Sequence, residues 1–255
     1  MAHASCLAST PPKDDCLVAI HQPNFFPWLG YFNKIARSDV FIMLENVQFP
    51  KTGGTWMNRV RIMDNGRPAW LTMPIVRSYH GVRSVRDMHI NNGLPWRPRV
   101  LNAIQGAYGR APHFKAVFEF LSDALANPTD NLAEFNLTVI RTLVEALGLS
   151  SAKLVSGSSL NVEGNSTDLL VAMVKAVGGT AYLCGGGAGG YQQDDKFTAA
   201  DVRLRYQDFR HPVYQQINSG PFLPGLSIID VLMNCGFEQA RALVGASVLT
   251  TGARG

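Results

Sequence analysis

The sequence predicts an α/β protein with a Rossmann-like parallel or mixed sheet flanked by helices and a mostly helical middle segment. Short apolar runs alternate with stretches of helical periodicity along the chain. Near the amino-terminus, strand, loop, helix and strand follow one another within about 30 residues, which is the size of a βαβ unit. Residues 97–149 carry successive apolar stripes at helical spacing, which indicate packed helices.

The first βαβ unit sets the expected position of a ligand site. Leu17–Ile20 is a short apolar run typical of a buried strand, and Val40–Leu44 is a second one. Pro23 and Pro27 disfavour regular structure, so we expect a loop before a helix over residues 28–37. Ligands of open α/β sheets bind at the carboxyl ends of the strands. The loops that follow both strands should therefore face one crevice.

The remaining elements follow from turn and helix signals. Asn65-Gly66 predicts a hairpin between Arg59–Ile62 and Ala69–Met73. A second α/β half should begin with a strand at residues 153–155. Its further elements are expected to be a helix capped by Asn165-Ser166, a strand at Ala181–Cys184, a glycine loop over 185–190, a strand at 202–206 and a final helix at 228–235.

Composition predicts a single folded domain over residues 17–245, with flexible tails at 1–16 and 246–255. Hydrophobic residues make up 46% of the chain and charged residues 16%, which argues against global disorder. The four cysteines show no metal-ligand spacing, so no metal is expected. No segment approaches the roughly 20 apolar residues of a membrane span, and the amino-terminus lacks the apolar run of a signal peptide. We therefore predict a cytoplasmic protein.

The net charge of +4 is a mild excess, and the positive residues are scattered. The densest groups are Arg59 with Arg61 and Arg83 with Arg86. A protein that binds DNA usually carries a concentrated basic stripe, which this sequence lacks. The charge therefore favours an anionic small molecule as ligand over nucleic acid.

Polar side chains gather directly after the first predicted strand. A neutral His21 is suited to act there as general base, and Asn24 to orient a carbonyl group. Gln22 and Lys34 are further candidates for substrate binding. The alternative is that His21 and Asn24 only satisfy the backbone of the loop. The aromatic residues of the same stretch are expected to build the pocket wall: Phe25, Phe26 and Trp28.

A second group of candidates follows the second predicted strand. Glu45 would be a carboxylate in the cleft, suited to bind or deprotonate an amine. Arg59 beside Asn58 offers a fork for a carboxylate or phosphate, and Gln48 is a further binding candidate. The alternative for Glu45 is a surface salt bridge, which contributes little to stability.

The glycine loop over 185–190 follows a predicted strand, where backbone N–H groups can approach an anion closely. Gly185, Gly187 and Tyr191 are therefore substrate-binding candidates. The loop is neither a GxGxxG motif nor a P-loop, so it is a weak nucleotide signature. Cys184 at the strand end is expected to be a buried small hydrophobic residue rather than a nucleophile.

A fourth group lies near the carboxyl-terminus. Pro212 extends the chain beside His211, which would point into the cleft with Tyr214 as catalytic and binding candidates respectively. Ser227 and Asp230 have the spacing of a helix N-cap and N3 residue, so we expect capping there. A Ser–His–Asp triad from Ser227, His211 and Asp230 lacks a nucleophile elbow and is disfavoured.

Taken in order, several of these motifs resemble the WbqC-like family, from about Val18 to Gly236. The motifs are His21-Gln-Pro-Asn-Phe-Phe-Pro-Trp-Leu-Gly-Tyr-Phe-Asn-Lys34, Asp39-Val-Phe-Ile42, Val47-Gln-Phe49, Asn58-Arg59, Tyr182-Leu183, His211-Pro-Val-Tyr-Gln215 and Leu226-Ser-Ile-Ile-Asp230. Members of this family occur with polysaccharide genes, and a glycine or amino-acid transferase role has been proposed for them.

The resemblance implies an acyl or aminoacyl transferase, of glycyl type, that forms an amide on an amino-sugar or related metabolite in polysaccharide or natural-product biosynthesis. On this hypothesis His21 is the general base, Glu45 binds or deprotonates the amine, and Lys34 and Arg59 hold an anionic donor. The donor would be an activated acyl or aminoacyl group, on a carrier protein or tRNA among other sources. The sequence identifies neither a cofactor nor an oligomeric state.

Two other hypotheses stay open. The first is a nucleotidyltransferase-like ligase that activates a carboxylate with ATP. Trp28-Leu-Gly-Tyr31 occupies the place of the HxGH signature of nucleotidyltransferases, with both histidines replaced. The second is a non-catalytic accessory protein that binds a sugar or nucleotide.

Overall fold

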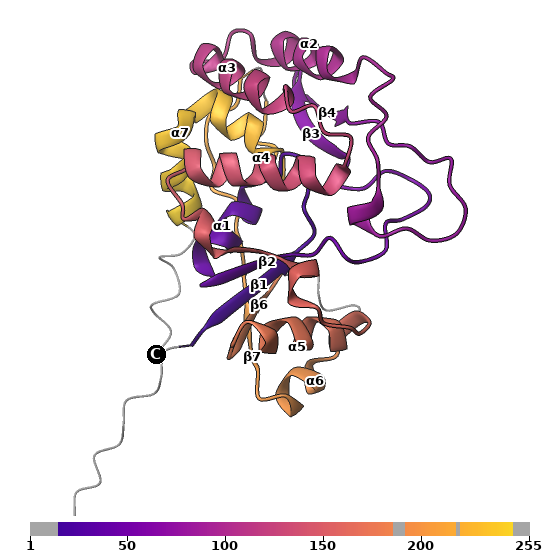
Figure 1. Ribbon diagram of the computed structural model, residues 1–255. Coiled ribbons are helices and arrows are strands. Elements are labelled where there is room, and N and C mark those ends of the chain that lie inside the picture. Colours follow the sequence, from indigo (N-terminus) through magenta and orange to yellow (C-terminus); the bar gives the residue numbers. More distant parts are fainter. Residues whose placement is uncertain (1–14, 186–191, 218–219, 247–255) are drawn as a thin grey trace, which may run out of the picture.

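The computed structural model describes residues 15–185, 192–217 and 220–246, which are organised around a parallel sheet (Figure 1). Its five strands pair in the order β5-β2-β1-β6-β7, and every neighbouring pair is parallel. In chain order these are the third, second, first, fourth and fifth strands, so the order reverses between β1 and β6. The strands are β1 (Leu17–His21), β2 (Val40–Met43), β5 (Leu154–Ser156), β6 (Ala181–Cys184) and β7 (Arg203–Tyr206).

Helices cover both faces of this sheet. Figure 1 shows α1, α4 and α7 on one side, and α5 and α6 on the other. The helices are α1 (Leu29–Arg37), α2 (Trp96–Tyr108), α3 (Phe114–Leu125), α4 (Leu132–Ala146), α5 (Ser166–Ala176), α6 (Asp194–Ala199) and α7 (Ile228–Ala246), with short 3₁₀ turns η1 (Val85–Asp87), η2 (Ser151–Lys153) and η3 (Gly157–Leu160). None of the helices within the described ranges is long and apolar enough to cross a membrane.

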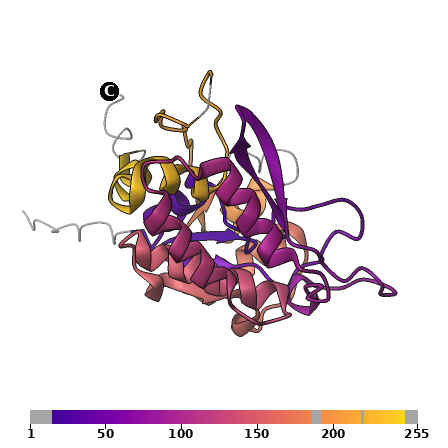
Figure 2. The same cartoon turned by 90° about the horizontal axis from the view of Figure 1, so that it is seen from above.

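A separate antiparallel hairpin consists of β3 (Arg59–Asp64) and β4 (Arg67–Thr72). In Figure 2 it stands at the edge of the layer formed by α2, α3 and α4. Asn65 and Gly66 both have positive φ angles, 46° and 78°, as the tight hairpin turn requires.

The core has two parts because successive side chains of a strand point to opposite faces of the sheet. In β1, Ala19 packs into the larger cluster with α1, α4 and α7, whereas Val18 and Ile20 pack into the smaller cluster with α5 and α6. In β2, Phe41 and Ile42 divide in the same way. Burial on both faces explains why these strands appear in the sequence as continuous apolar runs.

The predicted α/β class, the amino-terminal βαβ unit, the hairpin and the helical middle segment are confirmed. Three details differ from expectation. The short helix α6 was not predicted, because only Phe197 of its residues is buried. Helix α7 runs past Cys235 to Ala246, with a break at Gly236 where φ is 72°. Asn165 precedes α5 but makes no side-chain cap hydrogen bond. The predicted tails lie almost entirely outside the described residues.

Candidate functional site

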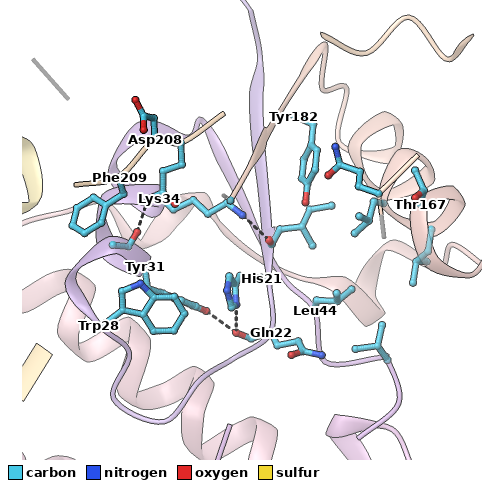
Figure 3. Close-up of a pocket in the computed structure, with 18 of the residues that line it drawn as sticks. His21, Gln22, Trp28, Tyr31, Lys34, Leu44, Thr167, Tyr182, Asp208 and Phe209 are labelled. Carbon is cyan, nitrogen blue, oxygen red and sulfur yellow. Dashed lines mark hydrogen bonds between the residues drawn. The ribbon is translucent and has the colours of Figure 1, made fainter. Parts of the chain in front are cut away.

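A cavity of about 790 Å³ opens at the carboxyl ends of β1 and β6, where the strand order reverses (Figure 3). Parallel α/β sheets bind their ligands at this switch point, because the connections leave the two strands in opposite directions and open a crevice. The walls come from β1, α1, the segment after β2, the start of α5, β6 and the segment after β7. Segments far apart in the sequence therefore meet at one site.

The loop between β1 and α1 is locked on both sides by distant backbone. Phe25 N–H donates to the Trp56 carbonyl (2.8 Å), and the Ser227 hydroxyl donates to the Phe26 carbonyl (2.7 Å). Phe26 has a φ of 39°, a strained value for a bulky residue that such contacts must maintain. Phe25 and Phe26 are fully buried in the core, so Trp28 alone of the three predicted wall residues lines the cavity.

His21, at the end of β1, has its tautomer set by its surroundings. Its Nδ1 lies 3.1 Å from the Gln22 carbonyl oxygen, which also accepts from the Tyr31 hydroxyl at 3.1 Å. Because a carbonyl can only accept, Nδ1 carries the proton in the neutral ring and Nε2 is left as the acceptor. The rings of Trp28 and Tyr31 pack edge-on against the imidazole, with centroids 5.6 and 4.9 Å away.

Burial, with a smaller effect of the nearby Lys34 ammonium, lowers the pKa of His21 from 6.5 to about 4. His21 is therefore neutral at physiological pH. Below pH 6.5 the unfolded chain takes up a proton that the folded protein refuses, so His21 reduces stability as the pH falls from 6.5 towards 4.

Lys34 is a buried lysine in the wall of the cavity, with 4% of its surface exposed. Its ammonium donates to the Ile20 carbonyl at 3.1 Å and lies 5.9 Å from the centre of the Tyr182 ring. Within the described part of the chain, no carboxylate forms a salt bridge with it. Burial lowers its pKa from 10.5 to about 8. A buried cation without an acidic partner is suited to bind an anionic ligand group.

Replacing Lys34 by methionine is expected to raise the melting temperature at pH 7 by about 3–6 °C, a net gain of about 1–2 kcal/mol. The Lys34 amine has a pKa of 10.5 in the unfolded chain and of about 8 in the folded protein. As the pH falls from 10.5 to 8, the unfolded chain takes up a proton before the folded protein does, so the wild type loses stability over this range. Differential scanning calorimetry should show the gain disappear towards pH 10. The exposed Lys115→Met is the control, with a change within about 0.5 kcal/mol.

Two further cavity residues have backbone conformations that side chains rarely adopt. Ser166, at the start of α5, has a φ of 50°, and Asp208, after β7, has a φ of 43°. Such strain concentrates at ligand sites. Thr167 lies beside Ser166 at the amino-terminal end of α5, where unpaired N–H groups and the helix dipole favour an anion.

Gly30 allows α1 to approach the segment after β7. A Cβ atom at this position would lie 2.8 Å from the Phe209 ring and 2.9 Å from Trp28 Nε1. The Gln207 side chain secures the contact by donating to the Gly30 carbonyl at 2.6 Å. Trp28 and Phe209 both approach Gly30 and both line the cavity.

Glu45 does not line this cavity. Its buried carboxylate accepts hydrogen bonds from Gly157 N–H (3.1 Å), from Ser158 N–H and Oγ (2.9 and 2.7 Å), and from the Ser156 hydroxyl. These contacts hold the turn after β5 against the segment that follows β2. The expected shared crevice does exist, since Leu44 and Val47 after β2 line it together with His21, but Glu45 does not face it. The geometry of Glu45 indicates a structural role.

The other candidates from this region also lie away from the cavity lining. The Asn58 side chain bonds Thr55 N–H and the Met73 carbonyl, both at 3.1 Å, and so holds the entry to β3. Arg59 lies over the Trp70 ring on the hairpin, and Gln48 is exposed beside Ser84. Asn24 is buried, and its Nδ2 makes no hydrogen bond within the described structure.

The carboxyl-terminal candidates separate into two groups. His211 lines the cavity, and burial lowers its pKa below 6.5. Tyr214 instead donates to the buried Asp230 carboxylate at 2.6 Å. The Ser227 hydroxyl accepts from Ile229 N–H (3.2 Å), which confirms it as the cap of α7. The Asp230 carboxylate accepts from Tyr108, Tyr214 and Gln216, so its expected capping role is not seen. Neither Ser227 nor Asp230 is hydrogen-bonded to His211 in the described structure, and no triad forms.

Gly185 lines the cavity at the end of β6, whereas Gly187 and Tyr191 lie outside the described residues. Cys184 is fully buried, and burial raises its pKa, as expected of a structural cysteine. The described residues contain no group of three histidine, cysteine, aspartate or glutamate side chains that could hold a metal ion. The polar and aromatic cavity residues without a sequence signal are Thr167, Gln192, Gln207, Asp208 and Phe209. Ser166 and Tyr182 also line the cavity, although the sequence marks them only as part of a helix cap and of a family motif.

Comparison with known proteins agrees with the motifs described above. A model of the WbqC-like protein family matches residues 22–242. The chain is 29% identical over 223 residues to the uncharacterized protein Rv1507c of Mycobacterium tuberculosis (strain ATCC 25618 / H37Rv). The aligned region covers 87% of this chain and 94% of the relative. No solved structure gives a significant match. Because the family model spans most of the sequence, including the loop after His21, the chain belongs to the WbqC-like protein family.

Proposed function

We propose that this protein is an acyl or aminoacyl transferase that forms an amide on an amino-sugar or related metabolite. The observation that carries the proposal is the pairing of two functional groups in one cavity: a neutral His21 with Nε2 as acceptor, and a buried Lys34 without an acidic partner in the described chain. The first can accept a proton, and the second can hold a negative charge.

In the proposed reaction, the amine nitrogen of the acceptor attacks the acyl carbon of the donor. The new N–C bond forms, the bond to the leaving group breaks, and the leaving group departs with its electron pair. The proton lost from nitrogen passes to His21 Nε2. A base with a pKa of about 4 is adequate here, because the nitrogen becomes positively charged and strongly acidic as it attacks.

Lys34 would stabilise the negative charge that develops on the acyl oxygen or the leaving group. Burial strengthens this interaction, because little water competes for the charge inside the cavity. The amino-terminal end of α5 at Ser166 and Thr167 would bind a second negative group. An anion held beside Lys34 would also offset the positive charge that lowers the pKa of His21. The pKa of His21 would then rise towards the working pH.

The experiment incubates purified protein with amino-sugars and a panel of donors: acyl-coenzyme A, ATP with a free amino acid, and aminoacyl-tRNA. Mass spectrometry should detect the amide with wild-type protein, and the signal should vanish with His21→Asn. A product formed only with ATP, together with pyrophosphate, would instead support carboxylate activation. If no donor gives a product while a ligand still raises the melting temperature, the protein is an accessory binder.

Carboxylate activation by ATP is the second candidate, and one observation favours it. The third, second, first, fourth, fifth strand order is the dinucleotide-fold arrangement, with nucleotides bound at its switch point. Here α1 follows the first strand and places Gly30 and Lys34 at that point. ATP-dependent release of pyrophosphate in the presence of a free carboxylate separates the candidates, since the ligase requires it and a transferase with a preactivated donor does not.

A further inference from the structure

The outer face of the β3–β4 hairpin carries two exposed aromatic rings and two arginines. Side chains alternate across a strand, so Arg59 and Arg61 share one face while Val60 packs into the core on the other. Trp70 is the cross-strand partner of Arg61 and therefore lies on the same face. Trp56, just before β3, packs against Trp70 with ring centroids 5.5 Å apart. We call Trp56, Trp70, Arg59 and Arg61 the Trp–Arg platform.

Both aromatic rings of the platform are large apolar groups left open to solvent. Trp56 is 38% exposed and Trp70 is 47% exposed. They are the only tryptophans among the exposed large hydrophobic residues of the described chain, and the two contact each other. A pair of adjoining exposed indole rings is typical of surfaces that stack a planar ligand group.

The arginines of the platform are held beside the rings but are not neutralised. The guanidinium of Arg59 lies 4.3 Å from the centre of the Trp70 ring, and that of Arg61 lies 5.8 Å from Trp56 and 6.0 Å from Trp70. Neither forms a salt bridge within residues 15–185, 192–217 and 220–246. Arg61 Nε is buried and makes no hydrogen bond there. Two charged forks beside a stacking surface are available to an anion.

The platform adjoins the cavity through Trp28. The Trp28 ring lies 5.8 Å from Trp56 on the outside and 5.6 Å from the His21 ring on the inside. The backbone bond from Phe25 N–H to the Trp56 carbonyl fixes the platform to the loop that follows His21. A ligand that reaches from Lys34 past Trp28 would therefore place its outer part on the platform.

We propose that the Trp–Arg platform binds the nucleoside phosphate part of a substrate whose reacting part lies in the cavity. The base would stack on Trp56 and Trp70, and Arg59 and Arg61 would bind phosphate oxygens. A neutral sugar would use the rings but leave both guanidinium groups without an anion, so the charge favours a nucleotide-linked substrate. The inference rests on the proposed function for the location of the reacting group, and it adds the class of substrate.

The test measures binding without turnover. UDP and ADP are titrated into the full-length protein and followed by tryptophan fluorescence and calorimetry, with glucose and inorganic pyrophosphate as part-ligands. We expect saturable quenching by a nucleotide and weaker binding of both part-ligands. Trp70→Ala and Arg61→Met should each weaken nucleotide binding about tenfold or more. Arg67→Met, at the turn end of the same hairpin, should bind as the wild type does, and melting temperatures verify that every variant is folded.

The inference is overturned if neither nucleotide binds, or if Trp70→Ala and Arg61→Met both retain wild-type affinity. Binding that is lost in Lys34→Met but unchanged in both platform variants would place the nucleotide in the cavity and also overturn it. These outcomes are distinct from failure of the proposed function. A protein that binds UDP or ADP on the platform but forms no amide with any donor keeps the inference and loses the transferase.

Discussion

Replacing His21 by asparagine is expected to lower kcat/KM of the proposed amide-forming reaction by about 10²–10⁴-fold, the usual contribution of a general base. Asparagine can still donate to the Gln22 carbonyl, which holds the imidazole Nδ1 in the wild type. It has no basic nitrogen in place of Nε2. The variant should therefore bind substrate with a nearly unchanged Kd, while single-turnover rates fall. If the variant instead loses substrate affinity to the same extent as it loses kcat/KM, His21 serves substrate binding rather than proton transfer.

The pH profile distinguishes His21 from an ordinary histidine. Because its pKa is about 4, the basic form persists as the pH falls from 7 to 5. When kcat/KM is calculated for the unprotonated amine acceptor, it should therefore stay level where a pKa of 6.5 would cause a decline. Above pH 8 the Lys34 ammonium loses its proton, so affinity for an anionic donor should fall. His80→Asn, an exposed histidine outside the cavity lining, is the control and should keep the wild-type profile.

The sequence indicates those parts of the fold that depend on local periodicity. Leu17–Ile20 and Val40–Leu44 are buried on both faces, and their uninterrupted apolar character marks them as strands. His21 and Lys34 could be placed because both follow from one βαβ unit, in which the strand end and the next helix are neighbours. The order of strands across the sheet depends on contacts between distant segments, and no local pattern encodes it.

Glu45 was misplaced in the predicted site because its surroundings depend on contacts between distant segments. A polar residue just after the second predicted strand suggests a ligand contact, but Glu45 is absent from the lining of the cavity. Leu44 and Val47 line the cavity, but the Glu45 carboxylate between them accepts hydrogen bonds from Ser156–Ser158 instead. Thr167 and Phe209 reach the cavity from segments more than a hundred residues away from His21, so their contribution depends on the same long-range order.

Asp230→Ala is expected to cost about 3–5 kcal/mol of unfolding free energy, because it removes the acceptor at the centre of a buried network. The carboxylate accepts from the hydroxyls of Tyr108 (2.8 Å) and Tyr214 (2.6 Å) and from Gln216 Nε2 (3.0 Å). Tyr108 in turn accepts from Met63 N–H at 2.9 Å. The network thus connects α7, α2, β3 and the segment after β7.

Asp230→Asn should cost clearly less, because the amide retains an acceptor oxygen and carries no charge. Burial raises the pKa of Asp230, while the bonds from Tyr214, Tyr108 and Gln216 lower it in part. A raised pKa means that stability is lost as the pH rises through the folded value, so the neutral amide avoids a penalty present at pH 7. Urea denaturation should rank wild type, Asn and Ala in that order, with the exposed Asp123→Ala within about 0.5 kcal/mol of wild type.

Asp230→Ala should also change the cavity wall. Tyr214 and Gln216, which bind Asp230, belong to the same segment as the wall residues Phe209 and His211. Once the carboxylate is removed, two tyrosine hydroxyls lose their buried acceptor. This segment loses its hydrogen bonds from Tyr214 and Gln216 to α7 and keeps the one from Ile217 N–H to the Asn234 side chain. Ligand affinity should then fall in Asp230→Ala even at temperatures where the protein is folded, and it should recover largely in Asp230→Asn. Equal affinity in all three proteins would show that α7 stabilises the fold without positioning the cavity wall.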